Sequence, residues 1–158
     1  MAHVLETGFE ILNRENPNGS PTVMGYNIIN GELRSSRDGE TFESRNPAWL
    51  DDCLGVFPLS TREDVHDALI SAREAFSQWS QTPAPTRGQI IGNMGRLLME
   101  HKDDIVRVET REIGKTLKES AGEVQEAIDT CLFFQSEGRR LYGQTVNSEL
   151  PDKELFTY

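Results

Sequence analysis

The sequence predicts an α+β chain that is mainly helical and carries an N-terminal β-hairpin. Two observations predict this class. Asn30-Gly31 stands between two short segments expected to be strands, Tyr26–Ile29 and Glu32–Arg34, where a tight hairpin turn needs residues that tolerate positive φ. From residue 60 onward, apolar residues recur at steps of three and four, which is the period of a helix. The 158 residues are long enough for one domain with a core of its own.

The first 22 residues differ in composition from the rest. They are rich in Asn, Gly, Pro and Glu, and Asn16–Pro21 forms a turn cluster. Such a stretch favours a flexible N-terminal arm over residues 1–22. The hairpin and the helices are expected over residues 23–143, and a separate extended tail over residues 144–158.

Short strands are expected directly after the arm. Alternating or apolar residues separated by turn residues indicate them. Asp38-Gly39 and Asn46-Pro47 provide the turns between the later ones. The expected strands are Tyr26–Ile29, Glu32–Arg34, Thr41–Ser44 and Leu54–Phe57.

The first helix is expected to begin at a capping box formed by Ser60 and Glu63. Thr82–Pro85 ends it, because proline cannot donate to the preceding turn. The residues on its apolar face are Val65, Ala68, Leu69, Ala72, Ala75, Phe76 and Trp79.

Two further helical segments follow, separated by a bend near His101. The first starts near Thr86, and the second ends at Gly114, a residue suited to a left-handed C-terminal stop. Their apolar residues are Ile90, Ile91, Met94, Leu97, Leu98, Ile105, Val106, Val108 and Ile113.

A second capping box, Thr116 with Glu119, opens a long helix that Gly138 and Gly143 close. Its buried stripe is expected to hold Leu117, Ala121, Val124, Ile128, Cys131, Leu132 and Leu141. Among all these residues, Phe76, Trp79, Leu97 and Ile128 are expected in the helical core.

The tail reads as two extended segments around a Pro151-Asp152 turn, Gln144–Val146 and Leu155–Tyr158. The second is expected to lack a partner strand within the sequence. An unpaired, partly apolar edge is a template for joining another chain, so we expect the chain to self-associate.

The net charge of −10 argues against a nucleic-acid or anionic-membrane partner, because both need clustered Lys and Arg. No run approaches the roughly 18 apolar residues of a membrane span. An N-terminal export signal is not evident either. The cytoplasm is therefore the expected location.

Glycine-containing motifs do not indicate a nucleotide site. Gly114-Lys115-Thr116 resembles the end of a phosphate-binding loop, but Glu109 stands where that loop needs a glycine. Glycines 88, 92 and 95 lack the spacing of the dinucleotide fingerprint and lie within a helical repeat. Close helix packing explains them better.

Residues with catalytic or metal-binding chemistry are scattered. Cys53 is expected in a polar loop, and Cys131 among apolar neighbours that disfavour a thiolate nucleophile. The histidines form no ligand pair, and the carboxylates of the last helix more often form a solvated face. The histidines are His3, His66 and His101, and the carboxylates are Glu119, Glu123, Glu126 and Asp129. Arg139-Arg140 complements the macrodipole at the end of that helix. We therefore assign no catalytic, cofactor-binding or metal-binding residue.

The order and spacing of several short motifs nevertheless resemble the N-terminal part of the aldehyde dehydrogenase superfamily from about Tyr26 to Tyr158. The motifs are Ile29-Asn30-Gly31-Glu32, Asn46-Pro47-Ala48, Asp64-Val65, Ala68, Ala72, Ala75-Phe76, Trp79, Arg87, Leu97-Leu98, Glu112-Ile113-Gly114-Lys115, Glu119 and Glu123-Val124. Thr116 stands where many members of that family have proline.

The resemblance implies the N-terminal part of an α/β fold whose helices pack outside a coenzyme-binding domain. It implies oxidation of an aldehyde, with semialdehydes as candidates, by a cysteine nucleophile, a glutamate base and NAD or NADP. Those residues lie beyond the matching region, so this chain alone is expected to be inactive and to bind no cofactor. Residues 144–158 resemble the start of the arm that pairs subunits.

The implied partners are the remainder of the enzyme chain and further copies of it. Some family members hold a structural cation near residues matching Ser44, Arg45 and Glu112, and the sequence leaves that site open here. A second hypothesis also stays open, in which the chain is a free-standing, non-enzymatic helical module that binds partners through its apolar faces.

Overall fold

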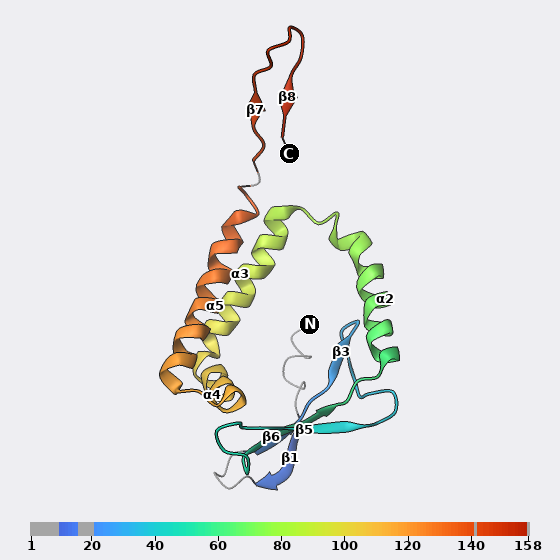
Figure 1. Ribbon diagram of the computed structural model, residues 1–158, viewed down its shortest axis with the longest axis vertical. Coiled ribbons are helices and arrows are strands. Elements are labelled where there is room, and N and C mark those ends of the chain that lie inside the picture. The colour runs from blue at the N-terminus through green and yellow to red at the C-terminus, as the bar shows by residue number, and fades with distance from the viewer. Residues whose placement is uncertain (1–9, 16–20, 141, 158) are drawn as a thin grey trace. The chain divides into compact units, whose positions relative to one another are not determined.

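The computed structural model describes residues 10–15, 21–140 and 142–157, drawn in Figure 1. They fall into two compact units. The first comprises Met1–Gln81 and Asp103–Gly122, and the second comprises Thr82–Lys102 and Glu123–Tyr158.

The first unit is built on a four-stranded sheet in the order β1-β2-β6-β5. Its strands are β1 (Glu10–Glu15), β2 (Pro21–Met24), β6 (Cys53–Pro58) and β5 (Thr41–Arg45). β2 and β6 run parallel, with Val23 opposite Gly55, and the two outer pairs are antiparallel.

Where residues 1–22 are described, they form strands rather than the flexible arm expected from the sequence. Residues 10–15 form a strand, and β2 begins at Pro21. The sequence signal is weak because β1 gains its backbone hydrogen bonds from β2, and pairing is decided by the partner strand rather than by composition. Residues 1–9 and 16–20 lie outside the described part of the chain.

The β-hairpin is confirmed. Strands β3 (Asn27–Ile29) and β4 (Glu32–Arg34) pair antiparallel, with Ile29 opposite Glu32. The two turn residues have positive φ, 54° at Asn30 and 76° at Gly31, as a type I′ turn requires. Beyond β4, strands β5 and β6 confirm the two further short strands predicted from the sequence.

Helix α2 (Arg62–Trp79) begins one residue later than predicted. The expected Ser60–Glu63 box is wrong, because the N-cap is Thr61 and its reciprocal partner is Asp64. The Asp64 carboxylate accepts from Thr61 N–H at 2.8 Å, and Thr61 Oγ1 accepts from Asp64 N–H at 3.3 Å. The Ser60 hydroxyl is instead paired with the Asn27 amide.

Helices α4 (Lys102–Ile113) and α5 (Leu117–Glu137) follow the predicted signals. His101 separates α4 from the preceding helix, and Gly114 ends α4 with a φ of 72°. Thr116 and Glu119 form the expected capping box, since the Glu119 carboxylate accepts from Thr116 N–H and Oγ1 donates to it as well.

In the second unit, α3 (Ala84–Glu100) lies beside α5, as Figure 1 shows. A glycine face makes this close contact possible. A Cβ on Gly95 would lie 2.8 Å from the Cβ of Cys131, and one on Gly88 would lie 2.5 Å from the backbone oxygen of Gln135. The prediction that these glycines serve helix packing is confirmed.

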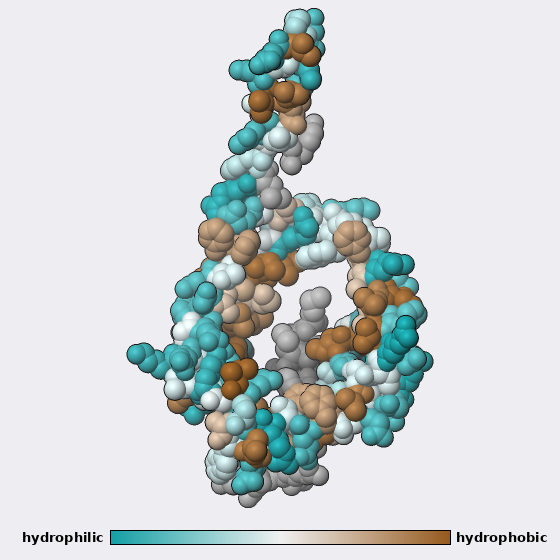
Figure 2. All heavy atoms as spheres, viewed as in Figure 1, coloured by the Kyte–Doolittle hydropathy of each residue, from teal (hydrophilic) through white to brown (hydrophobic). Residues whose placement is uncertain are grey.

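The core prediction is confirmed for Ile128, which is 1% exposed, and is wrong for Phe76, Trp79 and Leu97, which are 64%, 42% and 43% exposed. Figure 2 shows hydrophobic residues at the surface along α2. The helical period places these side chains on one face, but it does not state that a second layer covers that face.

The tail forms a two-stranded ribbon, β7 (Thr145–Val146) and β8 (Leu155–Phe156). Val146 lies opposite Leu155, so the expectation that the last strand lacks a partner within the chain is wrong. The strands are joined through a turn in which Asp152 has a φ of 59°. Leu141 and Tyr158 lie outside the described residues.

Candidate functional site

A well enclosed ion pair among the described residues of the first unit is formed by Asp52 and Arg111. Asp52 follows the Asn46–Pro47 turn between β5 and β6, and its side chain is 0% exposed. Arg111 Nε donates to Oδ2 at 3.0 Å, and Nη2 donates to Oδ1 at 2.8 Å. The amide of Asn46 adds a donor to Oδ2 at 3.2 Å. This arrangement is bidentate, the strongest geometry available to an arginine and a carboxylate.

The backbone around Asp52 explains why the pair forms here. Asp52 N–H donates to Trp49 O at 2.9 Å, and Asn46 N–H donates to Asp52 O at 3.0 Å, which closes the turn. Gly114, at the end of α4, lies so close to this turn that an added Cβ would be 2.9 Å from Pro47 Cγ. The pair therefore fastens α4 to the sheet, and its carboxylate accepts from both Arg111 and Asn46.

The residues that the resemblance connects with a structural cation do not form an acidic cluster. Arg45 donates to Glu43 at 2.5 Å and to Leu50 O at 2.9 Å. The hydrogen bond to Glu43 and its negative charge raise the pKa of Arg45 above its ordinary value. Among the described residues, no group of three or more His, Cys, Asp and Glu side chains could hold a metal ion.

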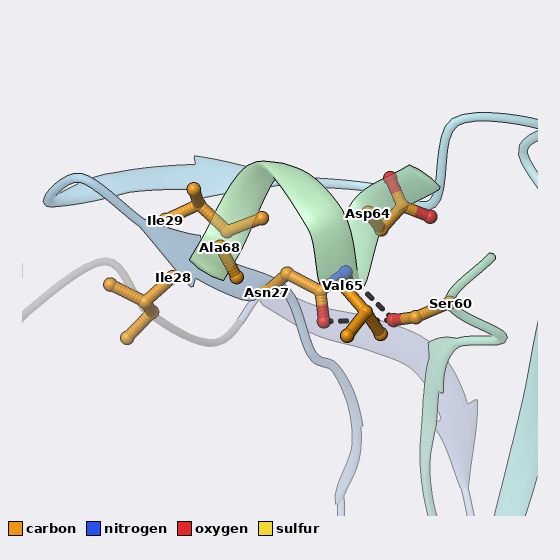
Figure 3. A pocket seen from close by; sticks show the side chains of 7 residues that line it. All are labelled: Asn27, Ile28, Ile29, Ser60, Asp64, Val65 and Ala68. Carbon is orange, nitrogen blue, oxygen red and sulfur yellow. Dashed lines mark hydrogen bonds between the residues drawn. The ribbon is translucent and has the colours of Figure 1, made fainter. Parts of the chain in front are cut away.

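A pocket of about 170 Å³ lies between β3 and α2 and is shown in Figure 3. Two of its polar side chains are hydrogen-bonded to each other, because Asn27 Nδ2 donates to Ser60 Oγ at 2.9 Å. Asp64 accepts from the backbone N–H groups of Thr61 and Arg37, and these bonds lower its pKa. The lining residues are Asn27, Ile28, Ile29, Ser60, Asp64, Val65 and Ala68.

A second pocket of about 210 Å³ lies farther along the hairpin and α2. Two of its charged residues are engaged, Arg34 with Glu32 and Asp67 with Arg37. Pockets that enclose small organic ligands usually measure about 300–1,000 Å³. Both pockets are smaller than that, so neither suits a dinucleotide.

The two thiols are enclosed. Cys53 is the first residue of β6 and is buried, so its expected place in a polar loop is wrong. Its Sγ lies 3.8 Å from Gly55 O, to which the thiol donates. Cys131 is buried as expected, in the contact between α5 and the glycine face of α3. A cysteine nucleophile needs access to its substrate, and neither thiol has it in this structure.

The glycines and the lysine of the two glycine-containing motifs are engaged in packing and in an ion pair. Lys115 forms an ion pair with Glu109 at 2.5 Å, and Gly114 packs against the Asn46–Pro47 turn. Glycines 88, 92 and 95 face α5 rather than an open loop, so their N–H groups belong to a helix. These three glycines therefore do not lie in a loop of the kind that holds a pyrophosphate. None of the helices described combines the length and apolarity needed to cross a bilayer.

The sequence of this chain is similar to those of known proteins of one family. The pattern of the aldehyde dehydrogenase family matches residues 33–158. An α-ketoglutarate semialdehyde dehydrogenase of Haloferax volcanii is 37% identical over 131 residues, which are 83% of this chain and 27% of that protein. The NADP(+) succinate-semialdehyde dehydrogenase of Escherichia coli K12 is also 37% identical, over 81% of this chain and 26% of that protein.

Solved structures agree in fold. A crystal structure of an E. coli NADP-dependent enzyme matches 83% of this chain and 27% of its own, with a TM-score of 0.76 and 36% identity. Betaine aldehyde dehydrogenase from Staphylococcus aureus, in complex with NAD+, matches 82% and 26% with a TM-score of 0.74 and 30% identity. The chain thus spans about a quarter of the length of these relatives.

Proposed function

The chain belongs to the aldehyde dehydrogenase family and corresponds to an N-terminal portion of its fold, and from this premise we propose that it is part of an enzyme that oxidises a semialdehyde to a carboxylate with NAD or NADP. The observation that carries the proposal is the match of 83% of the chain to 27% of a semialdehyde dehydrogenase at 37% identity. A second such relative has the same level of identity, which supports a semialdehyde as the substrate class.

We further propose that these 158 residues contain no catalytic, cofactor-binding or metal-binding residue. Both cysteines are buried, the carboxylates of Asp52 and Asp64 are engaged in structural hydrogen bonds, and the two pockets beside the β3–β4 hairpin are small. The cofactor, the nucleophile and the base then belong to the remainder of the enzyme chain, and the role of this portion is to support the domain that holds them.

The assembled enzyme is proposed to be a cytoplasmic homo-oligomer. The β7–β8 ribbon supports the oligomer, because Val146, Leu155 and Phe156 leave apolar surface exposed on a two-stranded element. A two-stranded ribbon alone is only marginally stable in water, so pairing with another copy would stabilise it.

The test compares the 158-residue chain with the full-length polypeptide of its gene. Each is incubated with NAD+ or NADP+ and a panel of semialdehydes and simple aldehydes, and reduced cofactor is measured. We expect turnover by the full-length protein only. A Cys53→Ala and a Cys131→Ala variant of the full-length protein should retain turnover, because neither thiol is assigned to catalysis.

The alternative of a free-standing interaction module is favoured by one observation, the exposed apolar face of α2 that includes Val65, Leu69 and Phe76. The same experiment separates the two. A full-length protein without activity on any aldehyde, together with a 158-residue chain that captures a different protein through this face, would support the module.

A further inference from the structure

The turn of the β3–β4 hairpin, Asn30-Gly31, has the features that allow an asparagine to lose its side-chain amide. Both residues are exposed, and a Cβ added to Gly31 would have no atom within 4 Å. In such a reaction the backbone nitrogen of the next residue attacks the side-chain carbonyl carbon, and a glycine places no side chain in the way. The hydrogen bond of a two-residue turn joins the flanking residues, so the N–H of Gly31 stays outside it.

The conformation of the turn holds this reaction back. Ring closure needs the Gly31 nitrogen on the same side of the Asn30 Cα–C bond as Cβ. Asn30 has a φ of 54°, in the left-handed region where ψ is about +47°, and the nitrogen then points almost opposite to Cβ. The peptide between the two residues must therefore rotate, which breaks the pairing of Ile29 with Glu32. Only an open hairpin can react.

The hairpin is held closed mainly by α2. Its two strands have three residues each and form a sheet of their own, and a two-stranded hairpin alone is only marginally stable. Ile29 is 7% exposed and lines one pocket with Ala68 of α2, as Figure 3 shows. Asn27 and Ser60 exchange two hydrogen bonds, at 2.9 and 3.2 Å. These contacts therefore set how often the hairpin opens locally.

We propose that Asn30 is a site of spontaneous deamidation and that the contacts of the hairpin with α2 control its rate. The Gly31 nitrogen gives up its proton to the solvent and forms a bond to Cγ of Asn30. The side-chain nitrogen takes up a proton and leaves as ammonia, so that a succinimide ring results. Water then opens the ring at either of its two carbonyl carbons, which gives aspartate or isoaspartate. The reaction consumes only water and needs neither a cofactor nor the proposed dehydrogenase activity.

The two products have different effects on the fold. Aspartate keeps the backbone and tolerates the positive φ of this turn, so the hairpin can close again. In isoaspartate the backbone runs through Cβ and Cγ, which adds one atom to the turn and moves Glu32 out of register with Ile29. The isoaspartate product therefore releases Ile29 from α2, and this change is irreversible.

The experiment incubates the full-length polypeptide and the 158-residue chain in mildly alkaline buffer and follows Asn30 by peptide mass spectrometry. Cleavage after Tyr26 separates it from Asn18-Gly19, which lies outside the described residues. We expect both products in both proteins. Conversion should be at least about tenfold slower in the folded proteins than in guanidinium chloride, which corresponds to an opening cost of about 1.4 kcal/mol.

Ser60→Ala removes both hydrogen bonds to Asn27 and should accelerate the conversion of Asn30 about fivefold, as expected for the loss of a hydrogen bond. The matched control is Ser77→Ala on the same helix. The Ser77 hydroxyl donates to Glu74 O at 3.1 Å, and its removal should leave the rate unchanged. Asn93 is an internal control, because it is exposed but the N–H of the following residue lies within α3.

Equal rates in the folded and denatured proteins would overturn the control of the reaction by the hairpin. Equal acceleration by Ser60→Ala and Ser77→Ala would overturn the role of the contacts with α2. An Asn30 that stays intact in the folded proteins and in their Ser60→Ala variants, or that converts no faster than Asn93, would overturn the site itself. These readouts do not depend on turnover, so an inactive enzyme would refute the proposed function and leave this inference standing.

Discussion

Replacing Asp52 by asparagine should strongly destabilise the first unit. The substitution keeps the shape of the side chain and removes its charge. It turns an amide towards three N–H donors, two from Arg111 and one from Asn46. Breaking a buried ion pair by removing one partner typically costs about 3–5 kcal/mol. Because Arg111 is 22% exposed and can recover some hydration, we expect the lower end, about 3 kcal/mol.

Denaturant unfolding followed by circular dichroism measures this loss, and a thermal midpoint about 6–12 °C lower should accompany it for a chain of this size. The matched control is Glu32→Gln, which breaks an exposed pair with Arg34 and should cost less than about 1 kcal/mol. In a double-mutant cycle, Arg111→Met should add little once Asp52 is replaced. A loss below about 1 kcal/mol for Asp52→Asn, or additive losses, would refute a buried pair that fastens α4 to the sheet.

Four further outcomes are expected. Gly95→Ala should destabilise the chain by about 1–3 kcal/mol through overpacking against α5. Gly122→Ala, with no atom within 4 Å of its added Cβ, should instead stabilise its helix by up to about 1 kcal/mol. Chemical denaturation measures both changes in stability, and equal effects would contradict the close contact of Gly95 with α5. Ile128→Ala should cost about 2–5 kcal/mol, and Phe76→Ala, at 64% exposure, should leave the midpoint of the 158-residue chain nearly unchanged. The pKa of Asp64 is lowered from 3.8, so the stability that its carboxylate contributes is complete above that value and is lost as pH falls through the lower folded-state pKa. Below about pH 4, the free energy of unfolding should therefore change less steeply with pH in Asp64→Asn than in the unmodified chain. An identical slope in the two proteins would contradict the capping role of Asp64. Light scattering over a concentration series should show self-association of the chain, which deleting residues 150–158 reduces; a constant monomer mass would contradict the role of the β7–β8 ribbon.

Local signals in the sequence predicted local structure well. Asn30-Gly31 predicted the hairpin because few other dipeptides adopt two positive φ values. Gly114 predicted the end of α4 because glycine readily adopts the positive φ found there. The Thr116–Glu119 box was found because its donors and acceptors lie three residues apart. At the start of α2 two such pairs overlap, and contacts distant in sequence decided between them: Asp64 also accepts from Arg37 N–H.

Features that depend on distant partners were not predicted. Asp52 and Arg111 are 59 residues apart, and no local pattern connects them. Burial of Cys53 follows from the position of β6 between β2 and β5, which composition does not reveal. The apolar period of α2 identified a face, but whether that face is covered depends on groups outside the helix, and Phe76 is exposed.

We propose that this chain is the N-terminal portion of an aldehyde dehydrogenase and contains none of its catalytic machinery. The most direct measurement is reduction of NAD+ and NADP+ by a semialdehyde panel, with the 158-residue chain and the full-length polypeptide assayed side by side. We expect turnover by the full-length protein and none by the shorter chain. Turnover by the 158-residue chain that Cys53→Ala or Cys131→Ala abolishes would contradict it.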